Sequence, residues 1–182
     1  MNTIRDPDSG KSWPALRDLI DHIESAYHGY VRLTVPVLSS VTEHIVRERT
    51  VSSHAIDHLQ RLCTALEDNL ESHVARQECR LFPKMRHLRE PVGEVAWASR
   101  LEDSLDEMMQ REERENREAM NLVEQIQKLL LQPAWVERGY HVEELKWDMN
   151  ELHENLAIHF HLETEVLFPA VRVTNDGRAL AV

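Results

Sequence analysis

Residues 73–83 read His-Val-Ala-Arg-Gln-Glu-Cys-Arg-Leu-Phe-Pro, and residues 159–169 read His-Phe-His-Leu-Glu-Thr-Glu-Val-Leu-Phe-Pro. Both segments begin with histidine and end with the same Leu-Phe-Pro triplet. A side chain four residues further along a helix returns to nearly the same face, so each histidine lies over the fifth residue of its segment. That residue is Gln77 in the first segment and Glu163 in the second. The two segments therefore predict two helices, each with a histidine and a second polar group on one face.

The repeat extends to the front half of each copy. Residues 19–22, Leu-Ile-Asp-His, align with residues 104–107, Ser-Leu-Asp-Glu, and the same alignment places His28 on Glu113. An internal repeat of this length predicts two copies of one helical hairpin.

Residues typical of turns lie at three places that would separate four helices. These places are 49–53, around Pro91 and Gly93, and between Pro133 and Gly139. In an up-down-up-down bundle, residues equidistant from a turn lie at one height. Four candidate ligand positions then form a single layer: His28, His73, Glu113 and His159. The sequence thus predicts an all-α, up-down-up-down four-helix bundle built from two repeated helical hairpins, closed beside the layer by the Leu-Phe-Pro triplets.

The length and composition fit one helical domain. The chain has 182 residues, 5% of them aromatic, with five glycines, which favours helices over a β-sandwich. We expect a polar N-terminal segment at 1–13, the bundle at 14–173 and a flexible tail at 174–182. Apolar residues spaced three and four apart predict helices over about 14–48, 52–85, 94–131 and 142–168, the first kinked locally at Pro36.

Charge and cysteine usage exclude several classes of protein. A net charge of −11 argues against a nucleic-acid surface or an anionic membrane surface. The N-terminal residues have no apolar stretch of signal-peptide kind, and no run of residues approaches a membrane span. Cys63 and Cys79 lie too far apart along one predicted helix to bridge, so reduced thiols and a cytoplasmic protein are expected.

The predicted layer offers a metal site. His28, His73 and His159 supply imidazoles, and Glu113 and Glu163 supply carboxylates, a set suited to iron, with manganese or zinc as alternatives. A lone histidine on a bundle face is more often only hydrogen-bonded to a carboxylate, but three at one height favour a metal. Glu163 is the strongest candidate for a bridge between two ions. Glu113 is weaker, since it also fits a solvated acidic face.

Other polar residues near the layer are poorer candidates. Gln77 offers only an uncharged amide oxygen, and five residues of helix rotate Glu78 by about 140° from His73. A zinc-type site at the far end of the bundle is a further alternative, although scattered polar histidines fit that pattern better. Its candidate residues are His44, His54, His58 and His141.

These motifs resemble the hemerythrin-like, HHE cation-binding family, and within it the group associated with repair of iron centres under nitric-oxide stress. The matching residues are 19–23 followed by Tyr27 and His28, then 77–83, and 159–169. The resemblance covers about residues 16–170 and implies a non-haem di-iron site with one histidine from each helix and two bridging glutamates. At two of those six positions this chain has Gln77 and Glu113 instead.

The resemblance implies a protein that binds one or two iron ions and binds or reacts with a small diatomic, nitric oxide or oxygen. A rearranged two-metal site and a single ion on His28, His73, His159 and Glu163 both stay open. Two other functions also stay open: a degenerate bundle acting as a regulatory or binding protein, and a carboxylate-rich oxidase or peroxidase. The sequence names no protein partner and does not decide between binding and catalysis.

Overall fold

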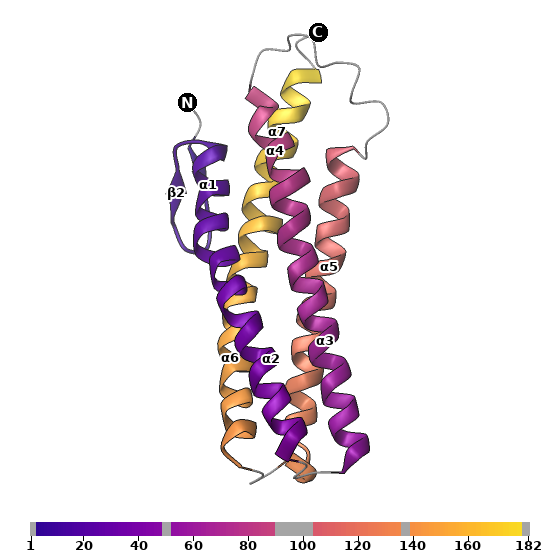
Figure 1. The fold of residues 1–182 in the computed structure, drawn as a ribbon. Coiled ribbons are helices and arrows are strands. Elements are labelled where there is room, and N and C mark those ends of the chain that lie inside the picture. Colours follow the sequence, from indigo (N-terminus) through magenta and orange to yellow (C-terminus); the bar gives the residue numbers. More distant parts are fainter. Residues whose placement is uncertain (1–2, 49–51, 90–103, 136–138, 180–182) are drawn as a thin grey trace.

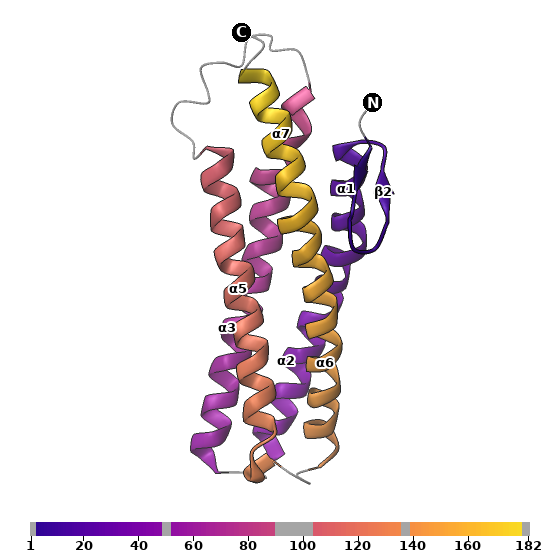
Figure 2. The same ribbon diagram turned by 180° about the vertical axis from the view of Figure 1, so that it is seen from behind.

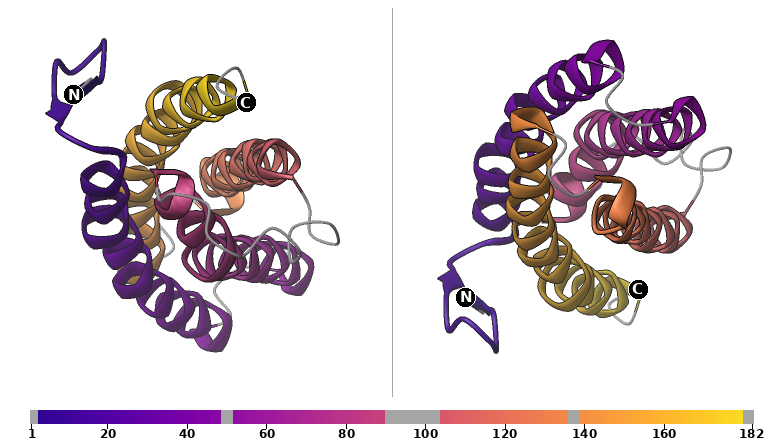
Figure 3. Two further views of the ribbon diagram at one scale, coloured as in Figure 1. Left: turned by 90° about the horizontal axis from the view of Figure 1, so that it is seen from above. Right: turned by 90° about the horizontal axis from the view of Figure 1, so that it is seen from below.

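The computed structural model describes residues 3–48, 52–89, 104–135 and 139–179. These residues form four long helical columns that alternate in direction, as Figures 1 and 2 show. The all-α four-helix bundle predicted from the sequence is confirmed. Seen along its length in Figure 3, the columns stand around a common interior.

Three of the columns are helices interrupted by a change of helical type, and the third column along the chain is mainly a single helix. The bounds of the elements are as follows: α1 (Leu16–His22), η1 (Ile23–His28) and α2 (Gly29–Glu48) in the first column; α3 (Ser53–Arg76), η2 (Gln77–Leu81), α4 (Phe82–Arg86) and η3 (His87–Arg89) in the second; α5 (Leu105–Leu130), followed by η5 (Pro133–Trp135), in the third; α6 (Tyr140–His161), η6 (Leu162–Leu167) and α7 (Phe168–Ala179) in the fourth. The helix α2 contacts α3 and α6, and α5 contacts the same two helices, so the four columns close a ring.

Three columns contain a π-helical turn, η1, η2 and η6. A π-helical turn inserts one extra residue into the hydrogen-bonded ladder and is found mostly at functional sites. Each of the three includes a residue of the predicted layer or its neighbour: His28 in η1, Gln77 in η2 and Glu163 in η6. The extra residue changes which side chains of the column face the bundle interior.

The helix starts follow their local sequence. Ser52 precedes α3, and its hydroxyl accepts a hydrogen bond from the backbone N–H of Ala55. Ser104 precedes α5 and forms a capping box with Glu107, whose side chain accepts from the Ser104 backbone N–H at 2.8 Å. These caps set where α3 and α5 begin.

The N-terminal segment forms a small hairpin that packs on the bundle. The strands β1 (Ile4–Arg5) and β2 (Ser12–Trp13) pair antiparallel, with Ile4 opposite Trp13. Trp13 is buried, and buried Asp6 lies 3.2 Å from Nε2 of His161. The sequence predicted only a polar segment here. At the other end, α7 continues to Ala179, into the range predicted as a tail.

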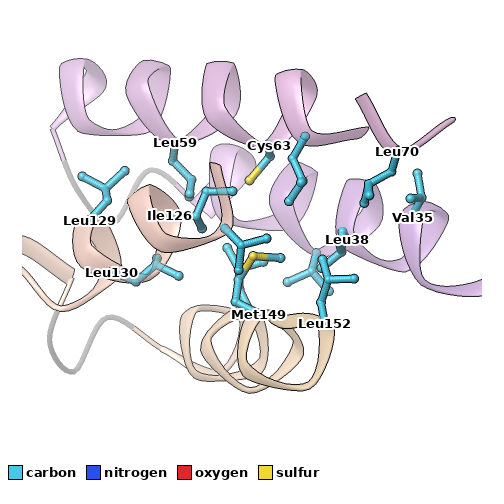
Figure 4. Packing of buried hydrophobic residues seen from close by; sticks show 14 of the residues in the cluster. Val35, Leu38, Leu59, Cys63, Leu70, Ile126, Leu129, Leu130, Met149 and Leu152 are labelled. Carbon is cyan, nitrogen blue, oxygen red and sulfur yellow. The ribbon is translucent and has the colours of Figure 1, made fainter. Parts of the chain in front are cut away.

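The apolar core has two parts, one on each side of the predicted layer. The larger part fills the half of the bundle near the α2–α3 connection, where Leu38, Leu59, Ile126 and Leu152 interdigitate (Figure 4). The other part includes both Leu-Phe pairs of the repeated triplets, all four residues with 0% exposure: Leu81, Phe82, Leu167 and Phe168. The residues between the two parts are therefore closed off from water in both directions.

Among the described residues, no helix is both long and apolar enough to cross a membrane. The two cysteines are free thiols, Cys63 buried in the core and Cys79 exposed.

Two leucines of α2 test the packing of the larger core. Leu38 is 1% exposed and Leu33 is 76% exposed. We expect Leu38→Ala to lower the free energy of unfolding by about 2–5 kcal/mol, because the substitution leaves a cavity. Leu33→Ala should change it by less than about 0.5 kcal/mol. Urea unfolding followed by circular dichroism measures both, and equal losses would contradict this description of the core.

Candidate metal centre

Four buried side chains converge between the two parts of the core. They are His28, His73, His159 and Glu163, and each is 0–1% exposed. One nitrogen or oxygen atom of each residue lies within 4.8 Å of the chosen atoms of the other three. The structure thus brings together four of the five residues that the sequence predicted for the site.

Two glutamates outside this group orient two of the imidazoles. Nδ1 of His28 lies 2.9 Å from Oε1 of Glu78, and Nδ1 of His73 lies 3.0 Å from Oε2 of Glu112. An ionised carboxylate only accepts hydrogen bonds, so each Nδ1 carries the proton that it donates. In the neutral form of either ring Nε2 is left with a lone pair, and no hydrogen bond occupies it.

Each of these glutamates is held in turn by an arginine. Arg32 of α2 pairs with Glu78, and Nε of Arg76 in α3 donates to Glu112 at 3.2 Å. The arginines are more exposed than the glutamates they hold, with side chains 51% and 25% exposed. Two chains of histidine, glutamate and arginine therefore lead outward from the centre.

Glu163 lies at the middle of the group. Its Oε1 is 3.0 Å from Nε2 of His159 and 3.5 Å from Nε2 of His73. Its Oε2 accepts a hydrogen bond from Nδ2 of Asn116 in α5 at 2.7 Å. One carboxylate oxygen is thus fixed by the protein, and the other is directed at the imidazoles.

Aromatic rings form the walls of the centre. The ring of His159 stacks on Tyr27 with a centroid separation of 5.3 Å, and the ring of His28 stacks on Phe82 at 5.5 Å. Phe160 packs edge-on against His73 at 5.5 Å. These contacts hold the imidazole planes and exclude water, which strengthens every electrostatic interaction inside.

Burial and the central carboxylate divide the protonation states of the group. Burial, with help from neighbouring His159, lowers the pKa of His28 to about 4, and burial also lowers the pKa of His159. Burial opposes protonation of His73 too, but the carboxylates of Glu163 and Glu112 raise its pKa to about 9. Although burial alone would raise the pKa of Glu163, the rings of His159 and His73 hold it well below its usual range. The centre therefore combines the buried anion of Glu163 with the neutral imidazoles of His28 and His159. The third imidazole, His73, favours the positively charged form.

The donor atoms fit a bound cation. Nε2 of His28, His73 and His159 and Oε1 of Glu163 are all buried, and none forms a hydrogen bond of acceptable geometry, although His159 Nε2 and Glu163 Oε1 lie 3.0 Å apart. Buried polar atoms are nearly always paired, so four unpaired ones at a single point indicate a missing common partner. Three imidazole nitrogens and one carboxylate oxygen are a ligand set for iron, zinc or manganese. A metal ion there would replace the proton on His73.

The structure places Glu113 apart from the convergent group. Its carboxylate accepts from Nη2 of Arg172 in α7 at 3.0 Å, and its side chain is 32% exposed. It is not part of the convergent group. One residue of helix rotates a side chain by about 100°, and α5 turns Glu112 and Asn116 toward the interior instead of Glu113.

The sequence missed Glu112 and Asn116 as contributors to the centre. Both are nearly buried, at 3% and 4% exposure, and each contacts one of the four convergent residues. Their spacing of four residues is the same as that of His73 with Gln77 and of His159 with Glu163. That spacing was the signal in the sequence that could have identified them.

Gln77 and Glu78 differ in their roles. Gln77 is 0% exposed, and neither its amide nitrogen nor its amide oxygen has a hydrogen-bond partner. Glu78 lies outside the group, against His28 and Arg32, in agreement with its predicted rotation away from His73.

The histidines near the far turns form no comparable group among the described residues, although the ring centroids of His44 and His141 lie 4.8 Å apart.

Comparisons with known proteins agree with this geometry. The sequence model of the Hemerythrin HHE cation binding domain matches residues 18–171. The chain is 28% identical over 163 residues to the iron-sulfur cluster repair protein YtfE of Salmonella typhimurium, a match covering 87% of this chain and 68% of that protein. The proteins of the same name from Salmonella paratyphi B and Salmonella newport are 27% identical over the same shares of each chain.

Two adjacent glutamates of α5 test the orientation of this helix. We expect Glu112→Gln to weaken binding of cobalt(II) about tenfold or more, because it removes the charged acceptor that orients His73. Glu113→Gln should leave the affinity within about twofold, since an exposed ion pair with Arg172 contributes little. Titration of the metal-free protein, followed by visible absorption, measures both. A larger effect at Glu113 would place that residue on the metal after all.

Proposed function

This chain belongs to the hemerythrin HHE cation-binding family, and on that premise we propose that it is a non-haem iron protein whose buried centre binds a small diatomic molecule. The single observation that carries the proposal is the convergence of four unpaired, buried donor atoms from His28, His73, His159 and Glu163. Iron is the metal that the family implies, and the nitrogen and oxygen donors suit it.

We infer that the centre holds one ion. Two close divalent cations need anionic oxygens between them to offset their repulsion, and the described centre offers one such carboxylate, Glu163. The corresponding position of the other copy is the uncharged Gln77. Glu112 is engaged by His73 and Arg76, and Glu113 by Arg172. The donor set therefore favours a mononuclear site over a rearranged two-metal site.

Each residue has a role in this proposal. Three imidazoles and one carboxylate would hold the ion, which would supply the affinity for an exogenous ligand. Asn116 keeps Oε2 of Glu163 engaged, so that Oε1 stays directed at the centre. Tyr27, Phe82 and Phe160 exclude bulk water from the rings. When bound, ferrous iron would supply the affinity for nitric oxide or oxygen.

The relatives suggest a setting for this chemistry. Proteins named for iron-sulfur cluster repair are 27–28% identical to this chain over most of its length. We propose that the chain acts in the same area, the response of iron centres to nitrosative or oxidative damage, by binding the diatomic that causes the damage.

Metal content tests the centre directly. We expect the protein, refolded or purified without chelator and supplied with ferrous iron, to hold about one ion per chain. His159→Ala and Glu163→Ala should each lose it, because each removes a donor that no nearby group replaces. Elemental analysis after desalting gives the count. About two ions would support the rearranged two-metal site, and none would favour a degenerate bundle with a regulatory or binding role.

Gln77→Glu gives the matched gain-of-function control for this count. It restores the carboxylate that the other half of the repeat has in Glu163. If the missing carboxylate limits the site to one ion, the variant should take up more iron than the parent protein. An unchanged count would show that Gln77 is not the limiting position.

Nitric oxide binding tests the function. We expect one equivalent of nitric oxide per iron to produce a new visible absorption band and an electron paramagnetic resonance signal in the anaerobic ferrous protein. The metal-free His159→Ala variant should show neither. Iron-loaded protein that leaves nitric oxide unbound would contradict the proposal, and sustained consumption of oxygen or hydrogen peroxide would instead indicate an oxidase or peroxidase.

A further inference from the structure

The surface between α5 and the column formed by α6, η6 and α7 carries a groove of about 960 Å³. Figure 2 shows α5 running beside this column. The groove is lined by residues of both sides, including Asn116 and Met120 from α5 and Ala157 and Phe160 from α6. It lies outside the four residues that form the proposed metal centre.

Two of the residues that line this groove contact residues of the centre. Asn116 lines the groove and donates its Nδ2 hydrogen bond to Glu163 at 2.7 Å. Phe160 also lines it, and its ring lies 5.5 Å from the ring of His73 and 5.1 Å from that of His159. Two side chains, an amide and an aromatic ring, therefore separate the groove from three of the four donors.

The side-chain oxygen of Asn116 has no hydrogen-bond partner. The residue is 4% exposed, and its Oδ1 is buried without a partner. A buried polar atom without a partner is unfavourable, so a polar molecule that reaches this amide would gain a hydrogen bond there.

An ion pair lies among the residues that line the groove. Glu113 of α5 and Arg172 of α7 both line the groove, and their side chains pair at 3.0 Å. Arg172 also lies 3.6 Å from Asp106 at the start of α5. Glu113, which the sequence placed on the metal, thus lines this groove and pairs with Arg172 across from α5.

A second groove, between α2 and α3, has no such connection. It measures about 330 Å³, and its lining includes Ser39, Cys63, Thr64 and Glu67. These residues lie beside the larger apolar core, and none of the lining residues of this groove is a donor of the centre.

We propose that the α5–α6 groove is the route by which small polar ligands of a few atoms reach the centre, and that Asn116 forms its inner end. This inference rests on the proposed metal centre, so the cobalt content of every protein is measured first. Failure of the parent protein to hold cobalt would count against the centre itself. Normal cobalt content with unaltered ligand access would count against the groove alone.

A plug attached after folding tests the route. In a Cys79→Ser background, Ala157→Cys places a thiol in the groove, and Thr64→Cys places one in the α2–α3 groove as the matched control. Cobalt(II)-loaded protein is treated with a bulky maleimide, and binding and release of azide are followed by stopped-flow absorption. The unlabelled protein is the reference in each case.

We expect the label at Ala157→Cys to slow both binding and release of azide about tenfold or more, because a blocked passage raises the barrier in both directions. The equilibrium affinity should stay within about threefold, and the label at Thr64→Cys should leave both rates within about twofold. Unchanged rates, a changed affinity with unchanged rates, or loss of cobalt on labelling would each overturn the proposal.

A pair of substitutions at Asn116 tests its inner end. Asn116→Ala and Asn116→Leu both lose the hydrogen bond to Glu163, but only the alanine variant widens the passage. Azide should therefore bind faster to the alanine variant than to the leucine variant. Equal rates in the two variants would show that Asn116 does not limit access.

Discussion

The carboxylate of Glu163, fully buried among three imidazoles, is the interaction on which the rest of the structure depends. A charged carboxylate inside an apolar core is costly unless it is paired and hydrogen-bonded. Here Asn116 engages one oxygen and the imidazoles of His159 and His73 lie beside the other. The two parts of the apolar core enclose this group from both ends of the bundle, so a cation is the partner that would best balance it.

Two chains of hydrogen bonds and ion pairs connect the imidazoles of the centre to the protein surface. His28 and His73 each donate to a glutamate, and each glutamate pairs with an arginine. Such chains fix the imidazole tautomers and planes without adding a further ligand. In a chain of net charge −11, they also place an acid beside each of these two imidazoles and a base beyond it, which keeps both acids paired.

The internal repeat is preserved in backbone and broken in chemistry. The second and fourth columns both turn π-helical beside their histidine, and both end the turn in a buried Leu-Phe pair. Only the fourth column carries a carboxylate at the position four residues on, since the second has Gln77. An amide preserves the volume of the site but not the charge, which is the physical basis for inferring one ion rather than two.

Much of this protein follows from local sequence patterns. The spacing of histidine with Leu-Phe-Pro, the apolar periodicity and the turn residues were enough to predict the bundle, to place His28, His73 and His159 at one height, and to place Glu163 one turn from His159 on the same face. The height of a residue along a bundle changes by only about 1.5 Å per residue. Aligning a helix wrongly by one residue therefore moves a predicted ligand only slightly along the bundle axis. That is why these four residues could be found from the sequence.

The direction in which a side chain points changes by about 100° per residue, and only the tertiary structure decided it. The equal-height rule led to Glu113, whereas the packing of α5 turns Glu112 and Asn116 inward and leaves Glu113 to pair with Arg172. The docking of Asp6 beside His161 likewise joins segments that are distant in sequence. The sequence determined which elements form and which residues share a level, while packing between the helices determined which of those residues meet.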